Sequence, residues 1–164
     1  MTPAKRLEDA ISIVPGVREA GFPAGLTLIG ATDSPDWVED LIAPHDWIVW
    51  KRNLSRAEVE ALASTHRWGL HCYRYEHYGL APAELQALGC ITFVHDTGGQ
   101  REIIRNPAQR YVDPADAVGK ITAMMQSEEL RSEAIEIGKA SAMMHRTSEF
   151  DNTFTHEAAR LVAS

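Results

Sequence analysis

Two carboxylates flank a glycine in a segment that is predicted to form a strand, a loop and a helix. Glu76 and Gly79 fall in the predicted loop, and Glu84 lies about one turn into the helix that opens near Leu80. The first backbone amides of a helix lack intrahelical partners and suit a diphosphate, and glycine lets a ligand approach the backbone closely. The carboxylates would repel a phosphate but accept hydrogen bonds from sugar and ribose hydroxyls. This layout predicts a site for a nucleotide sugar.

Each of these features also has an ordinary structural interpretation. A glutamate early in a helix is often only a favourable partner of the helix dipole, and a glycine before a helix is often only a turn. The spacing of the two glutamates inside one strand–loop–helix unit is the more specific signal. His71, close to the end of the same strand, is either a donor-site residue or a satisfied core histidine.

A metal site is not expected. The histidines and cysteines that invite one have spacings that match no standard zinc pattern. His71 and Cys72 are neighbours on a predicted strand, so their side chains should point in opposite directions. The residues concerned are His66, His71, Cys72, His77, Cys90 and His95.

The elements that must position this site alternate between strands and helices. Strands are predicted at 26–31, 46–51, 68–73, 90–96 and 109–114. Helices are predicted at 5–14, 35–43, 55–63 and 80–89, then through Ile104, with two or three more from Ala115 onward. Such alternation indicates an α/β fold, a Rossmann-like doubly wound parallel sheet whose ligands bind beyond the carboxyl ends of the strands. We therefore expect the site in the loops after Ala31, Lys51, Tyr73 and Asp96.

The first strand of such a sheet has no residues available to form it. The usual strand order is 3-2-1-4-5-6, and only Met1 to Ala4 precede the first predicted helix. We expect a defect between strands 26–31 and 68–73. Either these two strands pair directly, or another chain fills the gap, or residues upstream of Met1 supply the strand, and we favour the last.

Composition indicates one domain over residues 1–164, with 45% hydrophobic and 24% charged residues. The formal net charge of −7 argues against a nucleic-acid partner. The sequence shows no stretch long enough to cross a membrane and no secretion signal. Cys72 and Cys90 lie in apolar strand-like segments and are expected to be buried free thiols, which suits a reducing cytosol. We expect a cytoplasmic protein.

Residues 76–84, EHYGLAPAE, resemble the Glu-x7-Glu motif of retaining glycosyltransferases of the GT-B fold, in the large group called family 4. The wider run from Ser55 to Ile104 is also similar to that family. The segments GLH, EHYG and AELQALG resemble most closely the α-1,2-mannosyltransferases of lipid-linked oligosaccharide assembly. The resemblance covers only the family's C-terminal domain, so an N-terminal acceptor-binding domain is expected upstream.

The resemblance implies roles for individual residues. Glu76, the candidate catalytic residue, would contact hydroxyls of the transferred sugar, and Glu84 would hold the ribose hydroxyls. Lys5 matches a lysine that neutralises the diphosphate, whereas the family's arginine on the same loop has no counterpart. The remaining donor-binding candidates are the segment His77, Tyr78, Gly79 and Leu80, then Arg52 and the pair Gly98 and Gly99.

Two of these candidates have equally ordinary alternatives. Arg52 follows the second visible strand, near which the family places the nucleotide base, but it also suits a solvated basic loop. Gly98 and Gly99 either form a second site loop or a simple turn.

The expected function is donor binding in a retaining glycosyltransferase, incomplete alone. The substrate would be a nucleoside-diphosphate sugar, either GDP-mannose or a UDP sugar, without a further cofactor. The alternatives are a non-catalytic binding module that kept the fold, and a sugar-nucleotide epimerase or phosphorylase domain.

Overall fold

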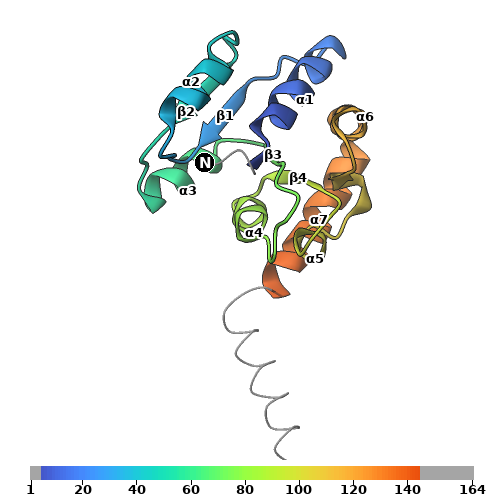
Figure 1. Ribbon diagram of the computed structural model, residues 1–164. Helices are drawn as coiled ribbons and strands as arrows, with labels where there is room; N and C mark the ends of the chain where they lie inside the picture. Colours follow the sequence, from blue (N-terminus) through green and yellow to red (C-terminus); the bar gives the residue numbers. More distant parts are fainter. Residues whose placement is uncertain (1–4, 145–164) are drawn as a thin grey trace, which may run out of the picture.

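The computed structural model describes residues 5–144, which form five strands, seven helices and a short 3-10 helix (Figure 1). The strands are β1 Leu26–Ile29, β2 Ile48–Lys51, β3 Trp68–His71, β4 Ile91–His95 and β5 Arg110–Tyr111. The helices are α1 Leu7–Glu19, α2 Pro35–Ile42, α3 Arg56–Ala63, α4 Leu80–Ala87, α5 Gln100–Ile103, α6 Pro114–Gln126 and α7 Glu128–Met144, with η2 at Pro107–Gln109.

The strands form two separate parallel sheets. β1 pairs with β2, and β3, β4 and β5 pair in that order. Within residues 5–144 no backbone hydrogen bond joins β1 to β3. The expected α/β fold with parallel strands is confirmed, and so is the expected defect at its centre. Direct pairing across the gap, one of the three outcomes considered, is wrong for this structure.

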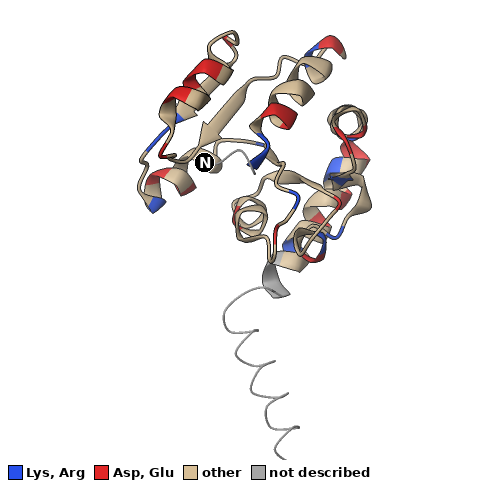
Figure 2. Cartoon of the chain, viewed as in Figure 1, with Lys and Arg blue, Asp and Glu red and all other residues tan. Residues whose placement is uncertain are grey.

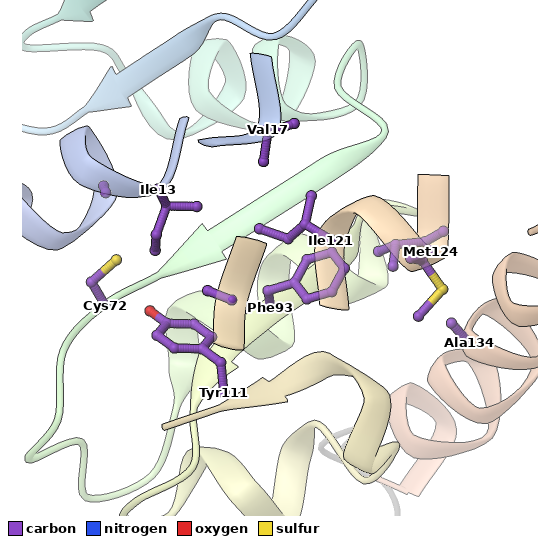
Figure 3. Close-up of a cluster of buried hydrophobic side chains, with 11 residues drawn as sticks. Ile13, Val17, Cys72, Phe93, Tyr111, Ile121, Met124 and Ala134 are labelled. Carbon is purple, nitrogen blue, oxygen red and sulfur yellow. The ribbon is translucent and has the colours of Figure 1, made fainter. Parts of the chain in front are cut away.

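The larger core lies around the three-stranded sheet. All five positions of β4 are buried, as expected for a parallel strand covered on both faces. Figure 3 shows Ile13 and Val17 of α1 meeting Phe93, Tyr111 and Ile121 in this core. Helices α1 and α6 pack together on one side of β3 and β4, and α4 lies on the other side with α7 behind it (Figure 1).

The smaller core lies beneath the two-stranded sheet. Leu7, Leu28 and Val38 are buried together, with tryptophans of α2 and β2 packed around them. Most charged residues are on helices and connecting loops; β2 contains Lys51 and β5 contains Arg110, whereas β1, β3 and β4 contain none (Figure 2). The uncharged strands therefore form the interior of the protein, and the loops that connect them carry the polar side chains.

Several predicted boundaries differ from the structure. The first helix was expected to end at Val14, but α1 continues through Pro15 to Glu19 because Val17 is needed in the core. The last strand was expected at 109–114, but Asp113 already caps α6 with its side chain. The predicted capping box of Ser55 and Glu58 is confirmed, and both cysteines are buried free thiols as expected.

Candidate functional site

The loop after β3 packs backbone to backbone against the loop after β4. The Gly99 amide donates to the Glu76 carbonyl at 2.8 Å. A Cβ added at Gly98 would lie 2.3 Å from the Glu76 carbonyl oxygen, and one at Gly99 would lie 2.1 Å from that of His77. These glycines are therefore required for the close approach that fixes the segment carrying Glu76.

Gly79 ends that loop and begins α4. Its φ of +102° is in the left-handed region, and a Cβ there would lie 3.1 Å from Cα of Gln100. In the structure this glycine thus allows the loop to approach α5. No side chain caps α4, and Leu80 is 65% exposed. The first amides of this eight-residue helix therefore have no capping side chain as a partner.

His71, Gln100 and Glu76 form the most constrained polar cluster of the site. The Gln100 side chain is fully buried, and its Nε2 donates to the carbonyls of Tyr73 at 2.9 Å and His95 at 2.8 Å. Since this fixes the amide, Oε1 accepts from Nδ1 of His71 at 2.9 Å. The other ring nitrogen, Nε2, lies 3.8 Å from Oε2 of Glu76.

The protonation of His71 follows from this environment. Burial of the ring is the main cause that lowers its pKa, and the nearby Lys5 cation acts in the same direction. The neutral ring with its proton on Nδ1 leaves an acceptor lone pair on Nε2. Nε2 of His71 and the carboxylate of Glu76 are then adjacent acceptors, which is suited to a ligand bearing hydroxyl groups.

The start of α1 is tied to the same loop. The Asp9 carboxylate accepts from Arg6 at 2.6 Å and from Arg74 at 3.3 Å. The hydrogen bond from Arg6 lowers the pKa of Asp9, so this carboxylate stays ionised in the fold. Lys5 lies over the Tyr73 ring, 4.3 Å from its centroid, which is a cation–π contact. A cation is thus held beside the end of β3.

Glu84 lies in the second turn of α4, with its side chain half exposed. Its carboxylate accepts from Nη1 of Arg56 at 3.0 Å. Arg56 opens α3 just after the carboxyl end of β2, and Glu76 follows the carboxyl end of β3. Both glutamates therefore lie at the carboxyl ends of the parallel strands, on the side of the sheets that the sequence predicted.

Arg52 lies outside this cluster. Its guanidinium donates to Glu39 of α2 at 3.0 Å and stacks 4.5 Å from the centroid of the Trp50 ring. The structure therefore brings Lys5, His71 and Glu76 together, places Glu84 beside Arg56, and holds Arg52 against α2. His77, Tyr78 and Leu80 lie exposed around the start of α4.

An open cavity of about 870 Å³ lies between β1 and β3 and reaches this cluster. Its polar lining at the carboxyl edge includes Lys5, Arg56, His71 and Glu84. Among residues 5–144 no three histidine, cysteine or acidic side chains gather in a way that could hold a metal ion. Within that same range, no helix has the length and apolarity to cross a bilayer.

Four contributing residues were not identified from the sequence: Asp9, Arg56, Arg74 and Gln100. Gln100 directly follows the Gly98–Gly99 pair, so its position after a site loop is a signal that could have been used. Arg56 follows the capping-box serine at the carboxyl edge. Asp9 and Arg74 are distant in sequence and meet only in the fold, so no local pattern indicates them.

Comparison with known proteins now gives these features a context. The family model described as "Glycosyl transferases group 1" matches residues 1–141. A human protein, GDP-Man:Man(3)GlcNAc(2)-PP-Dol alpha-1,2-mannosyltransferase, is 28% identical over 132 residues. That match covers 75% of this chain and 26% of the human protein, so the chain spans about a quarter of its curated relative.

Solved structures share the fold at low identity. A GtfA/B complex superposes with a TM-score of 0.83 at 17% identity, covering all of this chain and 35% of that one. The pneumococcal O-GlcNAc transferase GtfA in complex with UDP and GlcNAc gives 0.73 at 16% identity, covering 94% and 34%. The catalytic domain of cholesterol-alpha-glucosyltransferase from Helicobacter pylori gives 0.65 at 11% identity, covering 85% and 92%.

Proposed function

Because the chain belongs to the group 1 glycosyl transferases, we propose that it binds a nucleoside-diphosphate sugar at the carboxyl edge of its sheets. Donor binding would serve the transfer of the sugar with retention of its anomeric configuration. The cluster of His71, Glu76 and Gln100 carries this proposal. Two acceptors for hydroxyl groups are fixed there beside a helix whose first amides have no side-chain cap.

Each part of the site matches one part of such a donor. Amides at the start of α4 donate to the diphosphate, and Lys5 contributes positive charge close by. His71 and Glu76 accept hydrogen bonds from the hydroxyls of the sugar. Glu84 accepts from the ribose hydroxyls, for which Arg56 must yield its present hydrogen bond.

The reaction requires no metal and no protein nucleophile in this scheme. The bond between the anomeric carbon and the diphosphate oxygen breaks, and an acceptor hydroxyl oxygen bonds to the same face of that carbon. The hydroxyl proton passes to the departing diphosphate. The residues act by positioning the donor and stabilising the developing negative charge, while the acceptor is held by a further domain expected upstream.

We propose GDP-mannose as the donor. The support is the human relative, whose name specifies GDP-Man and mannosyl transfer. A UDP sugar is the alternative, since the GtfA structure that shares the fold was solved with UDP. A panel of both donor types decides between these two possibilities.

Calorimetric titration of the full chain with GDP, UDP, GDP-mannose and a UDP sugar tests the proposal. Binding should be weak, because the chain spans only 26% of its curated relative and 35% of the GtfA/B chain that shares its fold. Glu84→Ala should weaken it by roughly 1–3 kcal/mol, the cost of leaving ligand hydroxyls without a partner. Glu39→Ala is the matched control, since Glu39 also accepts from an arginine at 3.0 Å and is also about half exposed.

Equal affinity of wild type and Glu84→Ala would contradict the assignment of the ribose site. Absence of binding for every nucleotide in the panel would favour the alternative of a non-catalytic module. The open cavity between β1 and β3 favours that alternative. Because these two strands are not paired with each other, the loops that follow them are not held in a fixed position by one continuous sheet.

A further inference from the structure

The side-chain amide of Gln100 can take only one orientation. Its Nε2 donates to the carbonyls of Tyr73 and His95, at 2.9 and 2.8 Å, and the side chain is fully buried. Turning the amide over would bring Oε1 against these two carbonyls, and none of the three oxygens could donate a hydrogen bond. Oε1 is therefore held facing Nδ1 of His71, at 2.9 Å, and Nδ1 must carry the hydrogen of the ring.

Without Gln100, His71 and Glu76 would become partners of each other. Nε2 of His71 lies 3.8 Å from Oε2 of Glu76, just beyond hydrogen-bond distance. If the ring carried its hydrogen on Nε2, a small movement would let it donate to the carboxylate, and a charged acceptor makes a strong bond. Both groups would then be occupied. Gln100 opposes this internal bond by keeping the hydrogen on Nδ1.

The two acceptors that remain need a ligand with two hydrogens to donate. A second proton on the ring of His71 is disfavoured, because burial lowers its pKa and the Lys5 cation acts in the same direction. On the carboxylate of Glu76, Oε1 lies 3.4 Å from the amide of Tyr78, which leaves Oε2 facing His71. One hydroxyl group carries a single hydrogen, so two neighbouring hydroxyls are required to satisfy both acceptors.

We propose that Gln100 is a positioning residue, which keeps His71 and Glu76 as two separate acceptors for two neighbouring hydroxyl groups of the transferred sugar. This inference rests on the proposed donor site. It adds a buried residue that acts through His71 rather than by touching the donor. Recognition of the sugar depends on Gln100, whereas recognition of the diphosphate by the amides at the start of α4 does not.

The first measurement needs no ligand. Proton–nitrogen correlation spectra of the histidine rings at about pH 8, above the ordinary histidine pKa, show which ring nitrogen carries the hydrogen. In the wild type, His71 should carry it on Nδ1. In Gln100→Met, which lacks the amide, it should move to Nε2, toward Glu76. His66 is the internal reference, because its Nδ1 donates to the Leu62 carbonyl at 2.9 Å and should do so in both proteins.

Gln109→Met is the matched control. Gln109 is also buried, with 4% of its surface exposed, and its Nε2 also donates to a carbonyl, that of Thr92, at 2.9 Å. This variant should lose stability in the same way while the ring of His71 stays unchanged. The comparison separates the general cost of removing a buried amide from the specific loss of the contact with His71.

The second measurement separates the sugar from the nucleotide. Wild type, Gln100→Met and Gln109→Met are titrated with GDP and GDP-mannose, and with UDP and UDP-glucose. Gln100→Met should raise the Kd of the sugar-bearing ligand about tenfold, because the sugar hydroxyls lose their acceptors, and should leave the Kd of the nucleoside diphosphate unchanged. Gln109→Met should change neither Kd.

Three results would overturn the proposal. Wild-type His71 could carry its hydrogen on Nε2, a result that is decisive even if Gln100→Met fails to fold. The hydrogen could stay on Nδ1 in folded Gln100→Met. Finally, this variant could lose affinity for GDP and GDP-mannose by the same factor. If the ring hydrogens are as expected and no nucleotide binds to any of the proteins, donor binding is contradicted while the positioning of His71 by Gln100 is confirmed.

Discussion

The two sheets of this protein differ in how completely they are packed. Every position of β4 in the three-stranded sheet is buried, whereas no position of β2 in the two-stranded sheet is. Helices cover both faces of β3 and β4, while the edge of β1 that is not paired with β2 borders the open cavity. The two halves are joined through α1, which packs against both of the cores.

This difference explains where the polar cluster is placed. His71 extends from β3, and Gln100 hydrogen-bonds to carbonyls at the ends of β3 and β4. Fixed geometry requires well-packed strands beneath it. The two-stranded half supplies Arg56 and one wall of the cavity, and its loop arginine, Arg52, is bound to α2 instead.

The largest effect should come from removing a core ring of the three-stranded sheet. Phe93 is 1% exposed, and Phe93→Ala should lower the free energy of unfolding by about 3–5 kcal/mol. Val49→Ala, on the exposed side of β2, should change it by less than about 0.5 kcal/mol. Urea unfolding measures the free energy of unfolding of both variants. Similar decreases for the two would show that the two sheets are packed equally well.

The next effect should come from the glycines that hold the Glu76 loop. Gly99→Ala places a methyl group 2.1 Å from the His77 carbonyl oxygen, so the loop must shift at a cost of roughly 1–3 kcal/mol. Gly119→Ala in α6 is the control, because its Cβ meets nothing within 4 Å, and it should stabilise by about 0.5–1 kcal/mol. Thermal unfolding compares the stability of the two variants. If Gly99→Ala is as stable as the wild type, the close packing at Gly99 does not hold the Glu76 loop.

A smaller effect should appear in the pH dependence. Burial lowers the pKa of His71, so the unfolded chain takes up this proton first as pH falls. The contribution of the neutral His71 ring to the free energy of unfolding is therefore fully present above about pH 6.5, the ordinary histidine pKa. It is lost as the pH falls from there through the folded-state pKa. His71→Asn should remove this contribution from the pH dependence of the free energy of unfolding. An NMR titration midpoint of His71 at or above the ordinary histidine pKa would contradict the prediction.

The smallest effect should come from Arg52. Its pair with Glu39 is about half exposed, and exposed pairs of this kind often contribute nothing measurable. Arg52→Ala should leave both stability and nucleotide affinity unchanged, whereas Arg56→Ala should strengthen nucleotide affinity, because it frees the Glu84 carboxylate for the ribose hydroxyls. A loss of affinity in Arg52→Ala would support the alternative from the sequence in which this residue touches the nucleotide.

Much of the fold could be predicted because its signals are local. Apolar strand runs, the Ser55–Glu58 capping box and glycine punctuation depend only on neighbouring residues. Even the gap between β1 and β3 followed from counting strands against the usual order. The extension of α1 through Pro15 could not be predicted, since it depends on the burial of Val17 against distant elements.

The candidate site was predictable to a lesser degree. The Glu76–Glu84 spacing and the glycines predicted which loops form the site, and this remains a prediction. The structure adds a packing reason for the glycines that the sequence did not indicate. Gly98 and Gly99 face the backbone of Glu76 and His77, and Gly79 faces α5. The orientation of His71 by Gln100 depends on contacts 29 residues apart in sequence, which no local pattern encodes.

We propose above that the donor binds at the end of β3 and the start of α4. Backbone amide chemical shifts of the full chain, followed during titration with GDP and then UDP, test it most directly. We expect the largest shifts at Gly79, Leu80 and Gly99, with little change at Arg52. Shifts confined to the loop around Arg52, with the start of α4 unaffected, would contradict the account.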